Sequence, residues 1–327
     1  MTQPLQEINI VSCSPDSISG IHRFSHDAMA TVFEIFIIHD DARYAAQAAW
    51  AAFDELDKIE QSLSRFIENS DISQISNLPA HQPLQLGPDA FQCLHLATEI
   101  YHQTDGAFDI TIGALLDCWL RENKTLRAPS QNRLTLARRH TGMSLLELDE
   151  ARHTVQLSAS PVHIDLGGIG KGYAVDRMAR LLRDWSIDTA LIHSGHSSVL
   201  ALDAPPQLKA WPVTLTNPRN PKQTLAHLCL RDRALSGSGL QKGPHIIDPR
   251  TAQPVDGKLA AWVSAPNAAT ADALSTAFMV MSPDEIEKYC QRHPDTQAMI
   301  VLQDKNVETR QDKVLHFGPW KADNLTR

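Results

Sequence analysis

Residues 162–185, VHIDLGGIGKGYAVDRMARLLRDW, bring one acidic residue, four glycines and a lysine into the eight positions 165–172. The pattern predicts a short strand over 162–166, a Gly-rich turn and an amphipathic helix over 172–185. Glycine lets the backbone approach a phosphate closely, and a helix N-terminus presents N–H groups and a partial positive charge to it. The segment therefore predicts an anion-binding site, with Asp165 as a metal ligand or a hydrogen-bond acceptor.

This segment is not one of the common phosphate-binding loops. A Walker loop needs a glycine where Asp165 stands and a Ser or Thr where Gly172 stands. The dinucleotide fingerprint G-x-G-x-x-G is broken by Tyr173 at its third glycine position. A tight turn before a packed helix explains the same glycines equally well, so this segment alone leaves both interpretations open.

A carboxylate and a hydroxyl are four residues apart in the predicted helix 269–281, ATADALSTAFMVM. At this spacing Asp272 and Thr276 share one helix face, and such an oxygen pair suits a hard cation such as Mg²⁺. The structural alternative is that Asp272 only complements the helix dipole and that Thr276 belongs to the core.

Two further stretches place glycines beside a reactive or aromatic side chain. In 236–255 a Gly-rich turn precedes His245, which could act as a base near neutral pH. The alternative is an ordinary turn, in which Asp248 bonds its own backbone ahead of Pro249. In 104–119, Phe108 could line a slot for a ring, or it could follow a helix C-terminus and join the core.

The remaining pattern predicts an α/β fold of the mixed α+β kind, a single domain with a mixed sheet and a mainly helical insert over about 41–145. Residues 1–21 are expected to form a flexible arm, and residues 22–327 the domain. Strands are expected at 29–38, 154–157, 189–193, 198–202, 211–216, 227–231, 259–265 and 298–302, and further helices at 41–63, 88–103 and 283–292.

Composition limits the classes of function. The 327-residue chain is 43% hydrophobic and 21% charged, as in an ordinary globular enzyme. Its net charge of -8 argues against nucleic acid as a partner, and the basic residues 138–140 are interpreted as a solvated helix end. The five cysteines are scattered, which fits a reducing compartment. No signal peptide, lipobox or transmembrane segment is visible, so we expect a cytoplasmic protein, with a periplasmic location left open.

The order of the motifs resembles the ApbE family of flavin transferases, the FAD:protein FMN transferases. The matching segments are MAT at 29–31, SRF at 64–66, DGAFDITIGAL at 105–115, IDLGGIGKGYAVD at 164–176, HIIDPRT at 245–251 and TADALSTA at 270–277. Such enzymes bind FAD and Mg²⁺ and transfer the FMN half to a Ser or Thr hydroxyl of a target protein through a phosphoester bond, releasing AMP. The resemblance implies this reaction here, with FAD and an acceptor protein as partners.

The resemblance also implies site residues by motif position. It implies Mg²⁺ contacts from the Gly168 carbonyl, Asp272 and Thr276, and we assign His245 as the base for the attacking hydroxyl. Flavin-nucleotide contacts are implied for Met29, Phe66, Ala107, Phe108, Asp109, Asp165, Lys171 and Ile246. Transfer at phosphorus needs positioning and a cation that neutralises the charge growing on the pyrophosphate oxygens, and a Gly-rich helix start, one lysine and one Mg²⁺ site provide both.

The chain departs from the family pattern at three places. Ala30 stands where the family usually has glycine, and residues 194–198 read SGHSS where the family has a Gly-Gly turn followed by an acidic residue or Asn. The segment between Ser238 and His245 is short, which predicts a reduced cover over the active site. Two other functions stay open, a Mg²⁺-dependent FAD pyrophosphatase, in which water replaces the protein hydroxyl, and a non-catalytic flavin-binding protein.

Overall fold

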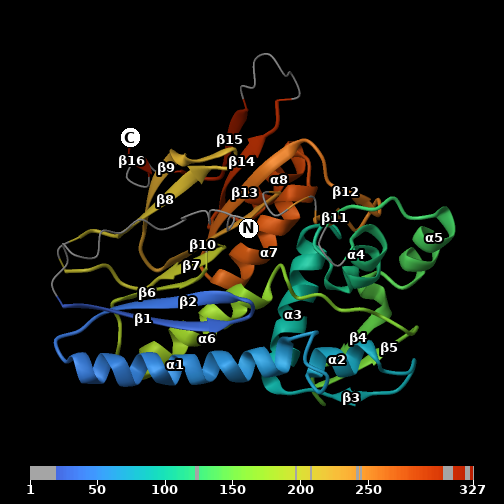
Figure 1. Ribbon diagram of the computed structural model, residues 1–327, viewed down its shortest axis with the longest axis horizontal. Helices are drawn as coiled ribbons and strands as arrows, with labels where there is room; N and C mark the ends of the chain where they lie inside the picture. Colours follow the sequence, from blue (N-terminus) through green and yellow to red (C-terminus); the bar gives the residue numbers. More distant parts are fainter. Residues whose placement is uncertain are drawn as a thin grey trace, which may run out of the picture.

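The computed structural model describes residues 20–121, 125–195, 197–206, 208–240, 243, 245–304, 312–320 and 325–326. Most of the expected flexible arm, 1–21, therefore lies outside the described residues, but Ile21 already begins strand β1 (Ile21–Ala28). The described chain has a mixed α+β fold (Figure 1), as the sequence predicts.

An eight-stranded sheet in the order β1-β2-β6-β7-β10-β13-β14-β15 is the centre of the fold. After β1 its strands are β2 (Thr31–Ile38), β6 (Ala190–Ser194), β7 (Ser198–Ala201), β10 (Arg233–Gly239), β13 (Lys258–Ala265), β14 (Gln297–Leu302) and β15 (Lys313–Phe317). Neighbouring strands in the described sheet all run antiparallel, so the prediction of a mixed sheet was wrong. A parallel pair needs a single crossover, whereas tight turns join β1 to β2 and β6 to β7, and two successive helices join β13 to β14.

Alternation along the strands gives this sheet two buried faces. On β2, for example, Ile35 and Ile37 belong to one hydrophobic core and Phe36 to another. The first core is covered by α1 (Ala42–Leu63), α6 (Gly170–Asp184) and α7 (Ala268–Val280). The second core, which contains the buried Trp211, is covered by a three-stranded sheet in the order β16-β9-β8. Its strands are β8 (Trp211–Asn217), β9 (Asn220–Leu230) and β16 (Leu325–Thr326).

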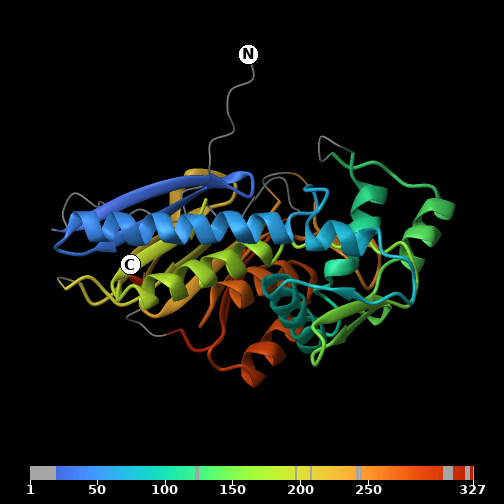
Figure 2. The same ribbon diagram turned by 90° about the horizontal axis from the view of Figure 1, so that it is seen from below.

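The segment 41–145 contains α1 together with four shorter helices. Figures 1 and 2 show α1 lying along β1 and α6, whereas α4 and α5 lie at one end of the molecule. The shorter helices are α2 (Asp71–Ser76), α3 (Pro88–Gln103), α4 (Gly113–Trp119) and α5 (Gln131–Arg139). The other elements are β3 (Leu84–Gln85), β4 (Leu146–Asp149), β5 (Thr154–Leu157), the hairpin of β11 (Ile247–Asp248) and β12 (Gln253–Pro254), and α8 (Pro283–Arg292).

Residues 161–166 have no regular secondary structure, so the predicted strand 162–166 was wrong. Their backbone pairs at two points with the preceding motif. The N–H of Asp165 donates to the carbonyl of Ile110 at 2.7 Å, and the N–H of Gly113 donates to the carbonyl of His163 at 3.0 Å. The partner segment turns at once into the 3₁₀ helix η2 (Ile110–Ile112) and then α4, so no strand is available to extend the ladder.

Helices α6 and α7 touch near their N-termini. A Cβ atom on Gly172 would overlap the carbonyl oxygen of Ala268, so glycine is required there. The Gly172 N–H donates to Oδ2 of Asp272 on α7 at 3.1 Å. In return, the Asp176 carboxylate on α6 accepts the N–H groups of Ala268 at 2.7 Å and Ala269 at 2.8 Å. Each helix thus supplies a carboxylate to N–H groups in the first turn of the other.

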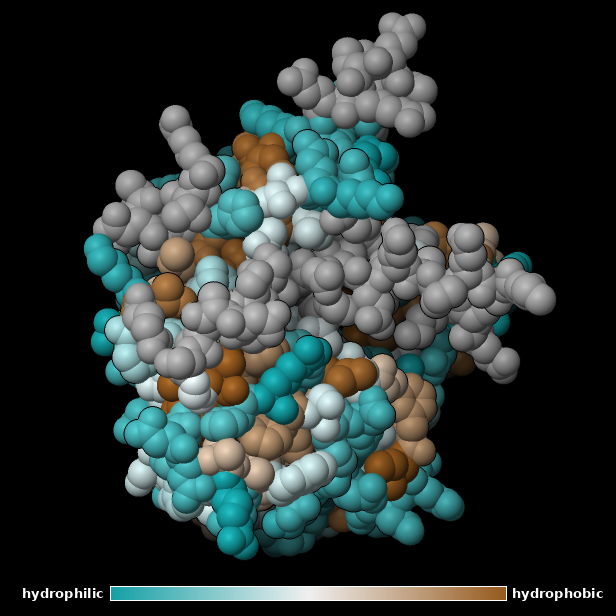
Figure 3. Space-filling model, turned by 60° about the vertical axis from the view of Figure 1, so that its left-hand side comes forward, coloured by the Kyte–Doolittle hydropathy of each residue, from teal (hydrophilic) through white to brown (hydrophobic). Residues whose placement is uncertain are grey.

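None of the described helices has both the length and the apolar character needed to cross a bilayer. On the face in Figure 3, hydrophobic residues occur in small separate groups among hydrophilic ones.

We expect Gly172→Ala to lower the free energy of unfolding by about 1–3 kcal/mol, the usual cost of overpacking, because the added methyl group must push α7 away from α6. Gly170→Ala in the same helix is the matched control, since the nearest atom to a Cβ there is Leu166 Cβ at 3.6 Å. Urea unfolding followed by circular dichroism measures both variants. Equal destabilisation of the two would contradict the close contact at Gly172.

Candidate active site at the start of helix α6

Three predicted site residues from distant parts of the chain meet at Gly168. A Cβ atom there would lie 2.9 Å from Oγ1 of Thr276 and 3.3 Å from a ring carbon of Phe108. Phe108 is buried, and Thr276 lies on α7. The backbone at Gly168 therefore passes directly against the Thr276 hydroxyl, in a space that any side chain would fill.

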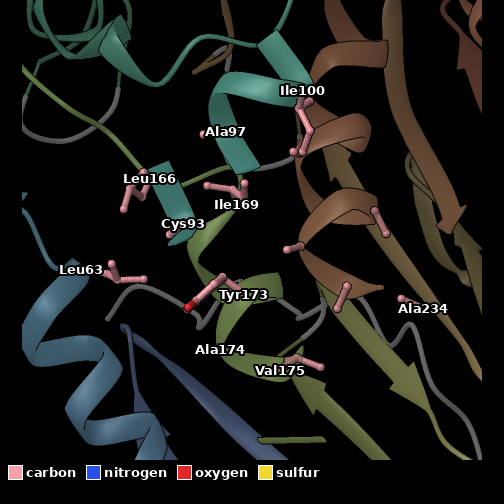
Figure 4. Packing of buried hydrophobic residues seen from close by; sticks show 14 of the residues in the cluster. Leu63, Cys93, Ala97, Ile100, Leu166, Ile169, Tyr173, Ala174, Val175 and Ala234 are labelled. Carbon is pink, nitrogen blue, oxygen red and sulfur yellow. The ribbon is translucent and has the colours of Figure 1, made fainter. Parts of the chain in front are cut away.

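One turn further on, Lys171 and Asp272 come together. The Lys171 ammonium donates to the carbonyl of Gly167 at 3.0 Å and lies 3.8 Å from Oδ2 of Asp272. Asp272 is only 3% exposed. The sequence led us to expect an open helix N-terminus here. Because Asp272 also accepts the Gly172 N–H, the N-terminus is only partly open. Figure 4 shows Leu166 and Ile169 beside α3 at the same helix start, where both are part of the first core.

A chain of hydroxyl groups continues the site into β10. The Oγ atom of Ser238 lies 3.1 Å from Oγ1 of Thr276 and 2.8 Å from Oγ of Ser275. The Ser275 hydroxyl in turn donates to the carbonyl of Asp272 at 2.8 Å. Ser238 is therefore a neighbour of the site that the sequence analysis did not select, and its position in a Gly-rich strand was the available signal.

The other end of α7 is held by a buried lysine that the sequence analysis also missed. The Lys258 ammonium donates to the carbonyls of Phe278 at 2.8 Å, Met279 at 3.2 Å, and also Met281. A cation at a helix C-terminus satisfies carbonyl groups that have no partner in the helix. Burial lowers the pKa of Lys258 to about 8.

Asp165 is oriented by an arginine that the sequence analysis did not select, although it lies within the SRF motif. Arg65 Nη1 lies 3.0 Å from Oδ2 of Asp165, whose Oδ1 accepts the N–H of Gly167 at 2.7 Å. The guanidinium of Arg65 also lies over the ring of Phe66, 4.9 Å from its centroid. Phe66 is 84% exposed, so the part of its ring that Arg65 does not cover is open to a ligand.

Met29 and Ala30 form the two-residue turn between β1 and β2, with φ values of 50° and 56°. The predicted strand 29–38 therefore begins at Thr31, and the strand before the turn was missed. A hairpin turn with two positive φ angles favours glycine, which explains why the family usually has glycine at position 30. The Met29 N–H donates to Oε1 of Glu60 at 2.7 Å, which ties this turn to α1.

Ala107 and Asp109 are both buried in the turn before α4. The Asp109 carboxylate accepts the N–H of Thr111 at 2.7 Å and its hydroxyl at 2.6 Å. The Thr111 oxygen in turn accepts the N–H of Gly142 at 2.6 Å. Burial raises the pKa of Asp109. This carboxylate is therefore engaged within the protein, where it caps η2.

His245 comes from the loop ahead of β11, separate from both helices. Its Nδ1 lies 2.7 Å from the carbonyl oxygen of Gly243. Because a carbonyl only accepts, Nδ1 of the neutral ring carries the hydrogen, and Nε2 holds the lone pair that a base needs. The next residue, Ile246, is buried, and its carbonyl accepts the N–H of Val255 at 3.0 Å. Part of the short cover before His245, namely 241, 242 and 244, lies outside the described residues.

The second departure from the family pattern, at 194–198, keeps one required glycine. Gly195 has a φ of 53°, and a Cβ atom there would overlap the Thr31 hydroxyl. Its N–H donates to the carbonyl of Val32 at 2.7 Å. His196 lies outside the described residues.

The donors around Gly168 suit a hard cation. They are the Asp272 carboxylate, the Thr276 hydroxyl and the Gly168 backbone. A side chain at position 168 would push this backbone away from Thr276. Across the described ranges, no group of three or more His, Cys, Asp or Glu side chains could hold a metal ion. Mg²⁺ commonly takes one or two carboxylates and completes its shell with water and substrate phosphates. The residues present therefore fit Mg²⁺ held together with a phosphate ligand.

Comparison with known proteins finds one matching family. The model of the ApbE family matches residues 29–300. The FAD:protein FMN transferase of Salmonella typhimurium is 26% identical over 297 residues, covering 86% of this chain and 84% of that protein. The FAD:protein FMN transferase of Chlamydia muridarum is 31% identical over 248 residues, covering 69% and 72%. The crystal structure of the ApbE protein from Thermotoga maritima superposes with a TM-score of 0.78 at 26% identity, covering 90% of this chain and 96% of that one.

The low pKa of Lys258 predicts how stability changes with pH. The folded protein loses this proton near pH 8, whereas the unfolded chain keeps it to about 10.5. In that window the unfolded chain binds more protons, so the contribution of Lys258 to the free energy of unfolding rises with pH. Lys258→Met should remove this rise, of order 1–3 kcal/mol.

Chemical unfolding at several pH values from 7.5 to 10.5 measures the effect. Lys288→Met, at an exposed position of α8, is the control and should leave the pH dependence as it is in the wild type. An unchanged slope in Lys258→Met would show that the buried amine does not titrate in this range.

Proposed function

Since this chain belongs to the ApbE family, whose model matches residues 29–300, we propose that it transfers FMN from FAD to a Ser or Thr hydroxyl of an acceptor protein. The product is a phosphoester, and AMP leaves. The Salmonella and Chlamydia relatives are both named FAD:protein FMN transferase. Most of each relative's length is covered, so the similarity is not confined to one part of the enzyme.

The observation that carries the proposal is the meeting of α6 and α7 at one point. Gly168 lies against Thr276, and Lys171 lies 3.8 Å from Asp272. A pyrophosphate needs a cationic partner and close backbone approach, whereas a divalent cation needs oxygen donors. This junction offers both within one turn of each helix, which suits a substrate that brings a metal ion and two phosphates together.

We assign Mg²⁺ to the Gly168 carbonyl, Asp272 and Thr276, with the remaining ligands from phosphate and water. When bound, the metal would neutralise the charge that grows on the pyrophosphate oxygens. Lys171 would place its ammonium beside the same phosphates, since it already lies near the Asp272 carboxylate. Asp272 would thus serve both ions while it keeps the Gly172 N–H bond that fixes its position.

His245 would take the proton of the acceptor hydroxyl on Nε2. The hydroxyl oxygen forms a bond to the FMN phosphorus, the bond from that phosphorus to the bridging oxygen breaks, and the electron pair leaves with AMP. What supports this role is the contact of Nδ1 with Gly243, because it leaves the other ring nitrogen as the acceptor. Positioning carries most of the catalysis at phosphorus, so the base adds to an arrangement already set by the helices.

We propose the flavin nucleotide contacts that the family motifs imply. Phe66 supports the proposal through its open aromatic face, and Arg65 would hold it and Asp165 in place. The full set is Met29, Phe66, Ala107, Phe108, Asp109, Asp165, Lys171 and Ile246.

We also propose a cytoplasmic location and no nucleic-acid substrate. The location is supported by free thiols at the described cysteines Cys93, Cys118, Cys229 and Cys290, and the second point by the net charge of -8.

The assay for this function is mass spectrometry of an acceptor protein after incubation with FAD and Mg²⁺. An FMN-sized mass gain on Ser or Thr, with AMP released, is expected. AMP and free FMN without a mass gain would instead indicate the pyrophosphatase. FAD binding without AMP release would indicate a flavin-binding protein.

In this assay, Asp272→Asn should raise the Mg²⁺ concentration for half-maximal transfer by at least about 10-fold. The amide oxygen can still accept the Gly172 N–H, so the fold should survive, but the charge that attracts the metal is lost. Asp184→Asn, exposed at the end of α6, is the matched control. A folded Asp272→Asn protein with the Mg²⁺ response of the wild type would rule out the metal assignment.

His245→Ala should lower the rate of transfer by about 10²–10⁴-fold, the usual contribution of a general base. FAD affinity, followed by flavin fluorescence, should change little, because the imidazole of His245 is assigned to the side of the site where the acceptor protein binds. His102→Ala, exposed on α3, serves as the control. Unchanged transfer, or a loss explained wholly by weaker FAD binding, would remove His245 from the mechanism.

A further inference from the structure

A stretch of unusual charge lies beside the site. Residues 123–146 contain no Asp or Glu but one lysine and four arginines, in a chain whose net charge is -8. The stretch covers α5 and the loops on either side of it. Together with Arg121, its arginines form what we call the α4–α5 basic face: Arg121, Arg127, Arg133, Arg138 and Arg139.

Within the part of the chain that the structure describes, which leaves out Glu122 beside Arg121, these arginines are not neutralised by carboxylates. Arg127 and Arg133 both donate to the main-chain carbonyl of Asp117, and Arg138 donates to that of Thr251. Among the residues that the structure describes, none of the five forms an ion pair, and the Asp117 carboxylate lies 3.1 Å from His163 instead.

Several arginines elsewhere in the described fold form ion pairs. Arg177 pairs with Glu55 at 2.8 Å, Arg219 with Asp312 at 2.6 Å, and Arg250 with Glu285 at 2.7 Å. The basic face therefore brings together five arginines without a described carboxylate partner, whereas these three arginines each have at least one.

Exposed apolar side chains lie within the same surface. Leu136 on α5 is 58% exposed, and Leu126 in the preceding loop is 37% exposed. Arg133, Leu136 and Arg139 are three residues apart along α5, so they share its outer side. The inner side of α5 carries the buried Leu134 and Ala137. The outer side thus combines cations with an uncovered hydrocarbon group, which suits a protein segment better than a simple anion.

The basic face borders the proposed active site on two sides. Leu134 and Ala137 pack in one cluster with Ile247, which is two residues after His245. The Trp119 indole donates to the carbonyl of Ala252 in the same loop at 2.8 Å. Figure 1 shows α4 and α5 beside the hairpin β11–β12.

On the other side, the Gly142 N–H donates to Thr111 at 2.6 Å. Thr111 belongs to the motif that holds Phe108 and Asp109. A partner bound to this face would therefore lie next to both the proposed base and the proposed flavin contacts.

We propose that the α4–α5 basic face binds an acidic segment of the acceptor protein, close to the Ser or Thr that receives FMN. This inference rests on the proposed function, whose acceptor it describes. Complementary charge raises the rate of encounter and fixes orientation, and its effect decreases as salt screens it. Cations at the end of α5 also complement the helix dipole, but that role would not explain Arg121, Arg127 and Arg133, which lie outside the last turn.

The test uses two synthetic peptides with a central Thr, one flanked by Asp and Glu and the other by Asn and Gln at the same positions. Fluorescence anisotropy at 50 mM NaCl, roughly the regime in which surface charge is little screened, measures binding of each labelled peptide. The wild type should bind the acidic peptide at least about 10-fold more tightly, and added salt should weaken this binding.

The double variant Arg133→Glu/Arg139→Glu should lose that preference while its FAD affinity is retained. The matched control is Arg180→Glu/Arg292→Glu, which reverses two exposed helix arginines on α6 and α8 and should keep the preference. If the peptides are modified, the loss in the first variant should appear in KM and not in kcat.

These measurements distinguish the proposed role of the basic face from the proposed transferase function. Equal binding of both peptides, or a preference that survives Arg133→Glu/Arg139→Glu, would overturn the basic face, even if FMN is transferred. Selective acidic binding without FMN transfer to any acceptor would support the face and contradict the proposed function. Tighter binding of a DNA duplex than of the acidic peptide, lost in the same variant, would assign the face to nucleic acid and overturn the proposal.

Discussion

The reciprocal contact between the N-termini of α6 and α7 fixes the relative position of the metal and phosphate residues that these helices carry at the candidate site. Asp272 accepts an N–H from α6, Asp176 accepts two from α7, and Gly172 lets the helices approach closely enough for both. A shift of either helix would break these charge-assisted bonds and leave buried carboxylates without hydrogen-bond partners, which is costly in a core. The same contact sets Gly168 against Thr276 and Lys171 near Asp272. A structural junction and a predicted metal and phosphate site therefore coincide.

Helix α7 is held at both ends, which explains how a buried, largely apolar helix can present two polar groups with little freedom. Asp176 and Asn267 satisfy its first N–H groups, and Lys258 satisfies its last carbonyls. Burial raises the pKa of Asp176 to about 6 and lowers that of Lys258 to about 8. Both shifts show that burial disfavours the charged form, so keeping these two ions in place lowers the free energy of unfolding.

Local signals predicted the helices well. The bounds of α3, which begins at Pro88, and of α8 agree with the prediction, and in the structure a capping box of Ser282 and Glu285 begins α8. Pairing between segments far apart in the chain was harder to predict from the sequence. The strand at 162–166 was wrong because its partner coils into η2, and β1 was missed because its turn, Met29-Ala30, lacks the usual Asn-Gly signal. Lys258 acts through partners far away in sequence, so no local pattern could select it. Arg65 and Ser238 also have distant partners, and the SRF motif and the Gly-rich strand were the local signals for them. The roles assigned to the site residues remain predictions.

The central sheet separates two cores that meet different neighbours. Residues that alternate along β2 belong either to the core shared with α6 and α7 or to the one around Trp211 under β8 and β9. A sheet strand passes side-chain changes poorly from one face to the other, because successive side chains point in opposite directions. As the sequence diverges, substitutions in the core around Trp211 can thus compensate one another without changes in the other core. The helix side, tied to the junction of α6 and α7, would have to change in concert or stay as it is.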